Sequence, residues 1–230
     1  QIKYRIYGGL SFYQRKEIKD FIAYLRILVN PQEEESIKRV INYPARGIGT
    51  TTLTKIALLA TEKNTTFWDI LSNAETFGLK GSTLTAIQDF VNTIRNLQLQ
   101  LTKKNAYEIA FEIGKQSGLV KELYTDKTIE GLARYENLQE LLNSIKEYTE
   151  TPTEDGELLD RNLGSYLQQI TLLTDADKEG DADEDVVKLM TIHAAKGLEF
   201  PNVFAVGLEE NIFPSSMSMY DRNDLEEERR

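Results

Sequence analysis

Residues 186–200 read VVKLMTIHAAKGLEF, and this stretch decides how the rest of the chain is interpreted. Its first seven residues are mostly β-branched or large and apolar, a composition typical of a strand. Small residues follow, and then Gly197 and Glu199. In open α/β sheets, ligands bind beyond the carboxyl ends of the strands, where small residues let a phosphate approach closely. We therefore expect a strand followed by a ligand-binding turn.

Strand-like sequence also occurs on both sides of this stretch. Residues 2–8 alternate apolar and polar side chains, and residues 201–207 (PNVFAVG) predict another strand. Most of the sequence between the two ends is helical in pattern. The fold class expected is therefore α/β with a large all-α insertion. Residues 1–30 and 174–230 would form the α/β domain, and residues 31–173 would form the inserted helical domain.

The first helix is expected after a capping box formed by Ser11 and Gln14, and it should end at Asn30 and Pro31. Residues 174–185 hold seven acidic residues and one lysine, which predicts a solvated linker. The aromatic residues Phe67, Trp68, Phe77 and Phe111 are expected in the core. The further helices are predicted at residues 33–42, 51–62, 66–72, 82–102, 105–116, 129–149 and 157–173.

Composition excludes several classes of protein. The chain has 230 residues, a formal net charge of −10, one histidine and no cysteine. No run of about 18 apolar residues occurs, so no membrane span or membrane partner is expected. The lack of cysteine excludes disulfides, thiolate metal sites and a cysteine nucleophile, and it favours a cytoplasmic location. The acidic balance by itself argues against nucleic acid as a partner.

A local charge pattern favours nucleic acid as a partner. Residues 36–63 contain five basic residues and one acidic residue, a local balance of +4. Within this window, Pro44-Ala45-Arg46-Gly47-Ile48-Gly49 forms a tight turn, and Thr50 or Thr51 could cap the next helix. The amides of the turn and of the helix N-terminus would point outward together as a phosphate cradle. The alternative is an ordinary glycine turn between two helices.

Side chains near residue 191 suit a similar ligand. Thr191 and His193 could donate hydrogen bonds to phosphate oxygens, and Glu199 could accept them from sugar hydroxyls. The alternative for His193 is a structural histidine at the end of a strand. No Walker A segment, paired-histidine metal spacing or G-x-S-x-G motif occurs, so we expect no catalytic residue and no metal site.

At these positions the sequence resembles the UvrD/Rep/PcrA family of superfamily 1 DNA helicases. Residues 189–200 resemble helicase motif V, and residues 44–49 resemble the family's GIG element. Residues 7–20 resemble a segment of the second motor domain, and residues 206–214 resemble the stretch that follows motif V. Residues 226–230 resemble the opening of motif VI. The five elements occur in the family's order across nearly the whole chain.

The resemblance implies a RecA-like motor domain of the P-loop NTPase type, called 2A, which is interrupted by a helical domain called 2B. It implies that Gly197 and Glu199 bind ATP, with Glu199 on the ribose. It further implies that Thr191 and His193 contact single-stranded DNA. Duplex DNA would be contacted by Arg46, Gly47, Ile48, Gly49 and Thr50.

The resemblance also implies that the sequence is part of a longer 3′ to 5′ helicase or translocase. ATP and Mg²⁺ would act in that longer protein together with its N-terminal motor domain, and the present chain alone would hold half an ATP site and be inactive. Two alternatives stay open at this point. One is a helicase-derived helical module that binds protein partners through 2B, and the other is the helicase part of an AddA- or RecB-type helicase-nuclease.

Overall fold

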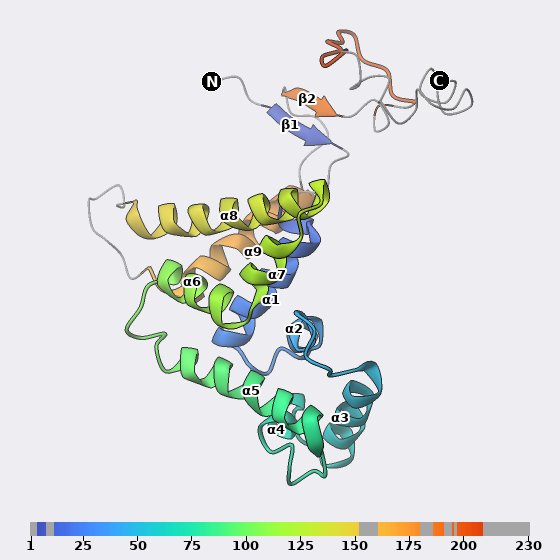
Figure 1. The fold of residues 1–230 in the computed structure, drawn as a ribbon. Coiled ribbons are helices and arrows are strands. Elements are labelled where there is room, and N and C mark those ends of the chain that lie inside the picture. Colours follow the sequence, from blue (N-terminus) through green and yellow to red (C-terminus); the bar gives the residue numbers. More distant parts are fainter. Residues whose placement is uncertain are drawn as a thin grey trace. The chain divides into compact units, whose positions relative to one another are not determined.

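The computed structural model describes residues 4–7, 12–151, 161–179, 186–190, 195 and 197–208. The chain divides into two compact units. One unit is helical and spans Leu10–Glu184, and the other combines Gln1–Gly9 with Asp185–Arg230. Figure 1 shows the helices of the first unit and the two strands of the second. No helix in the described part of the chain is long and apolar enough to span a membrane.

The second unit contains a parallel pair of strands. Strand β1 (Tyr4–Tyr7) lies beside β2 (Val187–Met190), with Tyr4 opposite Val187 and Tyr7 opposite Met190. Along the sequence, the helices therefore lie between two strands that pair with each other. Parallel pairing requires a crossover between the strands, and here the inserted helices provide it. The domain boundaries near residues 30 and 174 stay a prediction.

The helical unit begins with a short 3₁₀ turn, Phe12–Gln14, before the first α-helix. The α-helices are α1 (Lys16–Val29), α2 (Glu34–Val40), α3 (Thr50–Glu62), α4 (Phe67–Ser72), α5 (Gly81–Gln98), α6 (Ala106–Gln116), α7 (Leu119–Thr125), α8 (Ile129–Glu150) and α9 (Leu163–Glu179).

Helix α1 is the centre of the helical unit. It packs against α2, α5, α6, α8 and α9 (Figure 1). Its residues Ile18, Phe21 and Leu25 are completely buried, and its other faces are also largely covered. A helix that is buried on nearly all sides must be surrounded by other elements. α1 therefore organises the core of the helical unit.

Two carboxylates are buried on α1, and each has partners. Asp20 is 3% exposed and accepts hydrogen bonds from Arg39 of α2 at 2.7 Å and from Lys16 at 3.1 Å. Glu17 is 6% exposed and accepts one from the side-chain amide of Asn137 of α8 at 2.6 Å. Because a buried charge is tolerated only when it is paired, these bonds fix α1 against α2 and α8. The Lys16–Asp20 pair joins positions i and i+4 of the same helix.

Several sequence predictions about the helices were wrong in detail. α1 begins at Lys16 with Arg15 as its N-cap and no side-chain capping bond, while Ser11 lies outside the described residues. The acidic linker was predicted from residue 174, but α9 continues to Glu179. A helix that is already packed extends at low cost, so acidic composition did not end it. The short helix α7 was not predicted.

The strand predicted at residues 201–207 is absent, since residues 201–208 contain no strand. A strand is stable only when it pairs with a neighbour and packs one face, whereas Phe204 is 91% exposed. The core prediction holds for Phe67 and Trp68, which are buried, but Phe111 is 51% exposed. Phe111 belongs instead to the surface of α6.

The position of α1 can be tested with two matched phenylalanine substitutions. Phe21→Ala should lower the free energy of unfolding by about 3–5 kcal/mol, because it leaves a cavity in the centre of the helical unit. Phe111→Ala should lower it by about 1 kcal/mol or less, because the ring is half exposed. Urea denaturation followed by far-ultraviolet circular dichroism measures both values. Equal losses would contradict the central position of α1.

Candidate nucleic-acid interface

The loop between α2 and α3 places two glycines on the surface and one isoleucine in the core. Gly47 has φ +76°, a left-handed conformation that favours glycine, and Gly49 is the N-cap of α3. A Cβ atom added to either glycine would meet nothing within 4 Å. Ile48 between them is 1% exposed. The buried isoleucine anchors the loop, so both glycines face open space.

The amides of this loop do not all point outward. The side-chain oxygen Oδ1 of Asn42 accepts hydrogen bonds from the backbone N–H of Arg46 at 2.9 Å and of Ile48 at 3.0 Å. The N–H groups of Gly47, Gly49, Thr50 and Thr51 make no hydrogen bond to another described residue. The predicted phosphate cradle therefore has fewer available amides than expected. It consists of the N–H groups of the two glycines and of the first residues of α3.

The N-terminus of α3 differs from the sequence prediction. Gly49 is the N-cap and contributes no side-chain cap, while Thr50 is the first helical residue and is exposed. The hydroxyls of Thr50 and Thr51 therefore do not cap the helix. An uncapped N-terminus keeps its N–H donors and the positive end of the helix dipole available.

Arg46 faces the protein interior. Its Nη1 donates to the carbonyl oxygens of Val40 at 3.1 Å, Ile41 at 3.2 Å and Pro44 at 3.1 Å. Its Nη2 donates to the carbonyl oxygen of Ser117 at 2.7 Å. These acceptors include carbonyls at the C-terminal ends of α2 and α6, where a cation is stabilised. The sequence prediction placed Arg46 against DNA, whereas the structure uses its side chain to hold the loop.

The hydroxyl of Tyr24 on α1 completes this arrangement. It accepts a hydrogen bond from Nη2 of Arg46 at 2.8 Å and lies 2.6 Å from the carbonyl oxygen of Tyr43, to which it donates. Burial raises the pKa of Tyr24 to about 12, although the Arg46 guanidinium opposes the rise. The phenol therefore stays neutral and keeps its proton. Asn42, Tyr24 and Ser117 were missed by sequence reasoning; an asparagine shortly before a glycine turn is the one available signal.

The local positive charge is smaller than the sequence count. Lys38 pairs with Glu34 at 2.7 Å, and Arg39 pairs with Asp20 at 2.7 Å. Both carboxylates lie outside the window of residues 36–63 that was counted. With Arg46 also turned inward, Lys55 and Lys63 are the exposed cations of the window that have no ion pair with a described residue.

The second candidate region follows β2. Thr191 and His193 lie outside the described residues. Gly197 is exposed with φ +83°, and the N–H of Leu198 donates to the carbonyl oxygen of Ala195 at 2.9 Å, which closes a turn. Glu199 follows this turn and is exposed, without an ion pair to a described residue. Among the described residues, none occupies its carboxylate oxygens, which could accept hydrogen bonds from a ligand.

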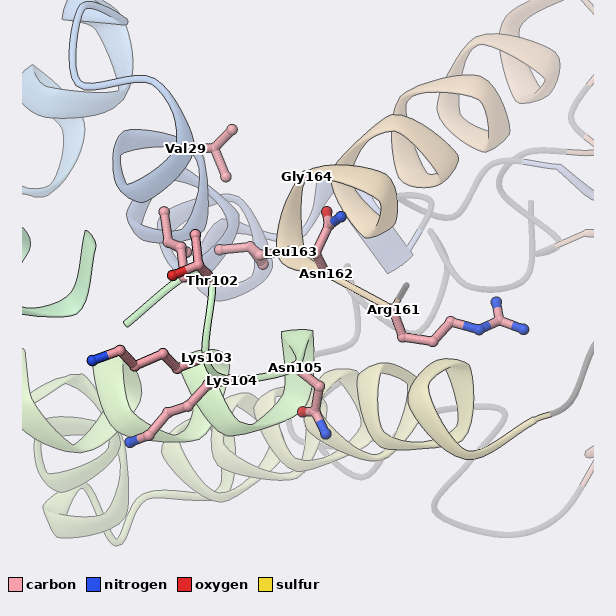
Figure 2. Close-up of a pocket in the computed structure, with 10 residues that line it drawn as sticks. Val29, Thr102, Lys103, Lys104, Asn105, Arg161, Asn162, Leu163 and Gly164 are labelled. Atoms are coloured by element: carbon pink, nitrogen blue, oxygen red, sulfur yellow. The ribbon is translucent and has the colours of Figure 1, made fainter. Parts of the chain in front are cut away.

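A pocket of about 570 Å³ lies beside the starts of α6 and α9 (Figure 2). Its basic side chains do not converge on one point. Figure 2 shows Lys103 and Lys104 pointing to the opposite side from Arg161. Lys104 pairs with Glu112 at 3.7 Å, and Arg161 donates to the carbonyl oxygen of Thr151 at 2.7 Å. We assign this pocket no ligand. No group of three potential metal-ligating side chains occurs in the described ranges.

The whole chain, residues 1–230, matches the family described as UvrD-like helicase C-terminal domain. The chain belongs to this family. It is 38% identical to the ATP-dependent DNA helicase PcrA of Bacillus subtilis (strain 168), over 100% of the chain and 31% of that protein. It is 39% identical to DNA helicase II of Haemophilus influenzae, again over 100% of the chain and 31% of that protein. This UvrD-like domain thus spans about a third of the length of these relatives.

The inward orientation of Arg46 predicts a stability role in this UvrD-like domain. Arg46→Ala should lower the free energy of unfolding by about 2–3 kcal/mol, because buried carbonyl groups lose their charged donor. Arg46→Lys should lower the free energy of unfolding by somewhat less, because one ammonium keeps some of these hydrogen bonds but cannot reach all the acceptors. Lys55→Ala is the control and should stay within about 0.5 kcal/mol of wild type. An Arg46→Ala chain that unfolds at the wild-type urea concentration would refute this role.

Proposed function

We propose that this chain is part of an ATP-dependent DNA helicase that moves 3′ to 5′ along DNA. Membership in the UvrD-like helicase C-terminal domain family supports the proposal, as do relatives named as DNA helicases that align with the whole chain. Residues 1–30 and 174–230 would belong to the RecA-like motor domain 2A, and residues 31–173 to the inserted domain 2B. ATP and Mg²⁺ would be used by the longer protein, together with its N-terminal motor domain.

One observation carries the duplex-binding part of the proposal. The loop exposes the N–H groups of Gly47, Gly49 and Thr50 at the start of a helix of 13 residues, with no Cβ atom in the way at either glycine. Such a group of amides, at the positive end of a helix dipole, is suited to a phosphate. Gly47, Gly49 and Thr50 would contact the DNA backbone, whereas Ile48 and Arg46 would hold the loop in place.

The turn after β2 would bind the nucleotide and the single strand. An exposed carboxylate fits a sugar hydroxyl donor, and Glu199 has no ion pair within the described part of the chain, so Glu199 would hold the ribose of ATP. Gly197 would let the backbone turn close to the nucleotide, because glycine adopts a positive φ without strain. Thr191 and His193 would donate hydrogen bonds to phosphates of single-stranded DNA. When bound, ATP would supply the free energy for translocation.

The duplex contact predicts a loss of binding in a double variant. Gly47→Asp with Gly49→Asp should weaken binding of the chain to a fluorescent DNA hairpin by about tenfold or more at low salt, because two carboxylates would then face phosphates. Fluorescence anisotropy measures the dissociation constant. Wild-type binding should itself weaken as salt increases.

A second glycine pair provides a matched control for this variant. Gly78 and Gly81 are also exposed, have φ +77° and +66°, and leave open space for a Cβ atom. Gly78→Asp with Gly81→Asp adds the same charge and at least as much backbone strain, because both of these glycines have positive φ whereas Gly49 does not. It should nevertheless change binding by about twofold at most. Equal binding by wild type and the Gly47/Gly49 variant, or equal losses in both variants, would reject the proposed contact.

The nucleotide contact is testable in a longer protein that includes the N-terminal motor domain. Glu199→Ala should raise the KM for ATP in DNA-stimulated hydrolysis by about tenfold, because a charged acceptor for the ribose is lost. Glu62→Ala, at an exposed position of α3, is the control and should leave the KM unchanged. An unchanged KM for Glu199→Ala would remove this residue from the nucleotide site.

A further inference from the structure

The helical unit has an open groove between α6, α7 and α8. No residue of the loop 42–49 lines it. These three helices contact one another (Figure 1). The groove has a volume of about 580 Å³, within the range of roughly 300–1,000 Å³ that is typical of ligand pockets. Its lining includes Phe111, Lys115, Lys121, Tyr124, Tyr135 and Leu138.

The groove has aromatic walls and an aliphatic base. Tyr124 of α7 and Tyr135 of α8 meet edge to face, with ring centroids 5.5 Å apart, while Tyr107 and Phe111 of α6 are 6.2 Å apart. Leu138 is completely buried beneath them. Phe111 is 51% exposed and Tyr124 is 56% exposed. Large aromatic surfaces that stay exposed around a hollow mark interaction sites, because covering them with a partner is favourable.

The charge of the groove is positive in a chain that is acidic overall. Lys115 and Lys121 line it, and the lining includes no carboxylate. Neither lysine has an ion pair with a described residue. The two lining lysines therefore favour a partner segment that carries carboxylates.

We propose that this groove docks an acidic amphipathic segment of a partner protein. Apolar side chains of the segment would cover Phe111, Tyr124 and the leucines at the base. Its carboxylates would pair with Lys115 and Lys121 at the rim. An amphipathic helix with apolar residues at positions i, i+3, i+4 and i+7 is the common ligand of such grooves. The proposal concerns a surface separate from the proposed DNA contacts and does not depend on them.

A single strand of nucleic acid suits this groove less well. Strand-binding grooves carry cations along the path of successive phosphates and present aromatic faces for stacking. Here the two lining lysines belong to the end of α6 and the start of α7, and the base is aliphatic. The edge-to-face pair of Tyr124 and Tyr135 also directs one ring toward the other rather than toward a base.

Selection of peptides from a random displayed library tests the proposal. The 230-residue chain is the target, and peptides that also bind a Phe111→Ser, Tyr124→Ser double variant are removed. We expect the remaining peptides to combine leucine, phenylalanine or tryptophan at helical spacing with aspartate or glutamate. The synthesised consensus peptide should bind the double variant at least about tenfold more weakly than wild type. Circular dichroism and urea midpoints confirm that both proteins are folded.

A charge reversal makes the test specific for the lysines. Lys115→Glu with Lys121→Glu should weaken binding of the acidic consensus peptide by about tenfold. The same variant should bind more tightly a peptide with lysines in place of the acidic residues. Lys55→Glu with Lys63→Glu is the matched control on α3 and should change neither affinity by more than about twofold.

Three results would overturn the proposal. The first is a selection without enriched peptides, or with peptides that bind the Phe111/Tyr124 variant as well as wild type. The second is an enrichment of basic sequences. The third is an oligothymidine strand that binds wild type, loses affinity in the Phe111/Tyr124 variant and displaces the consensus peptide, which would assign the groove to nucleic acid.

Discussion

The hydrogen bonds of the Arg46 guanidinium hold together parts of the helical unit that are far apart in sequence. They join the end of α2, the loop that follows it, the C-cap residue of α6 and the hydroxyl of Tyr24 on α1. A planar guanidinium with five N–H donors can satisfy several carbonyl oxygens at once, which a lysine cannot. One side chain thus satisfies acceptors from elements that are far apart in sequence. Asn42 adds to it by fixing the backbone of the same loop from inside.

The inward hydrogen bonds of Arg46 change which groups the loop can offer to a ligand. Because Arg46 points inward and Arg39 and Lys38 are paired, the loop reaches a ligand with backbone amides rather than with cationic side chains. Contacts of that kind recognise the phosphate backbone and not the base sequence. The lysines that line the groove between α6, α7 and α8 contribute positive charge elsewhere. The helical unit therefore has two candidate binding surfaces with different chemistry, one polar and one aromatic.

The sequence predicted the elements better than their ends. Most of the helices and the strands β1 and β2 followed from periodicity and from β-branched residues. The start of α1, the continuation of α9 to Glu179 and the lack of a strand at residues 201–207 did not. Those features depend on which neighbour is available to pack or pair, and local composition carries no information about it. Phe111 shows the same limit, because an aromatic side chain can lie in a core or line a groove.

For the candidate site, the sequence by itself determined the residue types and their order: a glycine, isoleucine and glycine before a helix, and a glycine and glutamate after a strand. Glycine has no Cβ atom and a carboxylate only accepts hydrogen bonds when ionised, so these properties are local and can be read from one stretch. Only the tertiary structure decided which amides stay free, that Arg46 turns inward, and that four aromatic side chains gather in one groove. These outcomes depend on acceptors and rings contributed by distant helices, and a hydrogen bond or a packed contact exists only once the fold has brought both partners together.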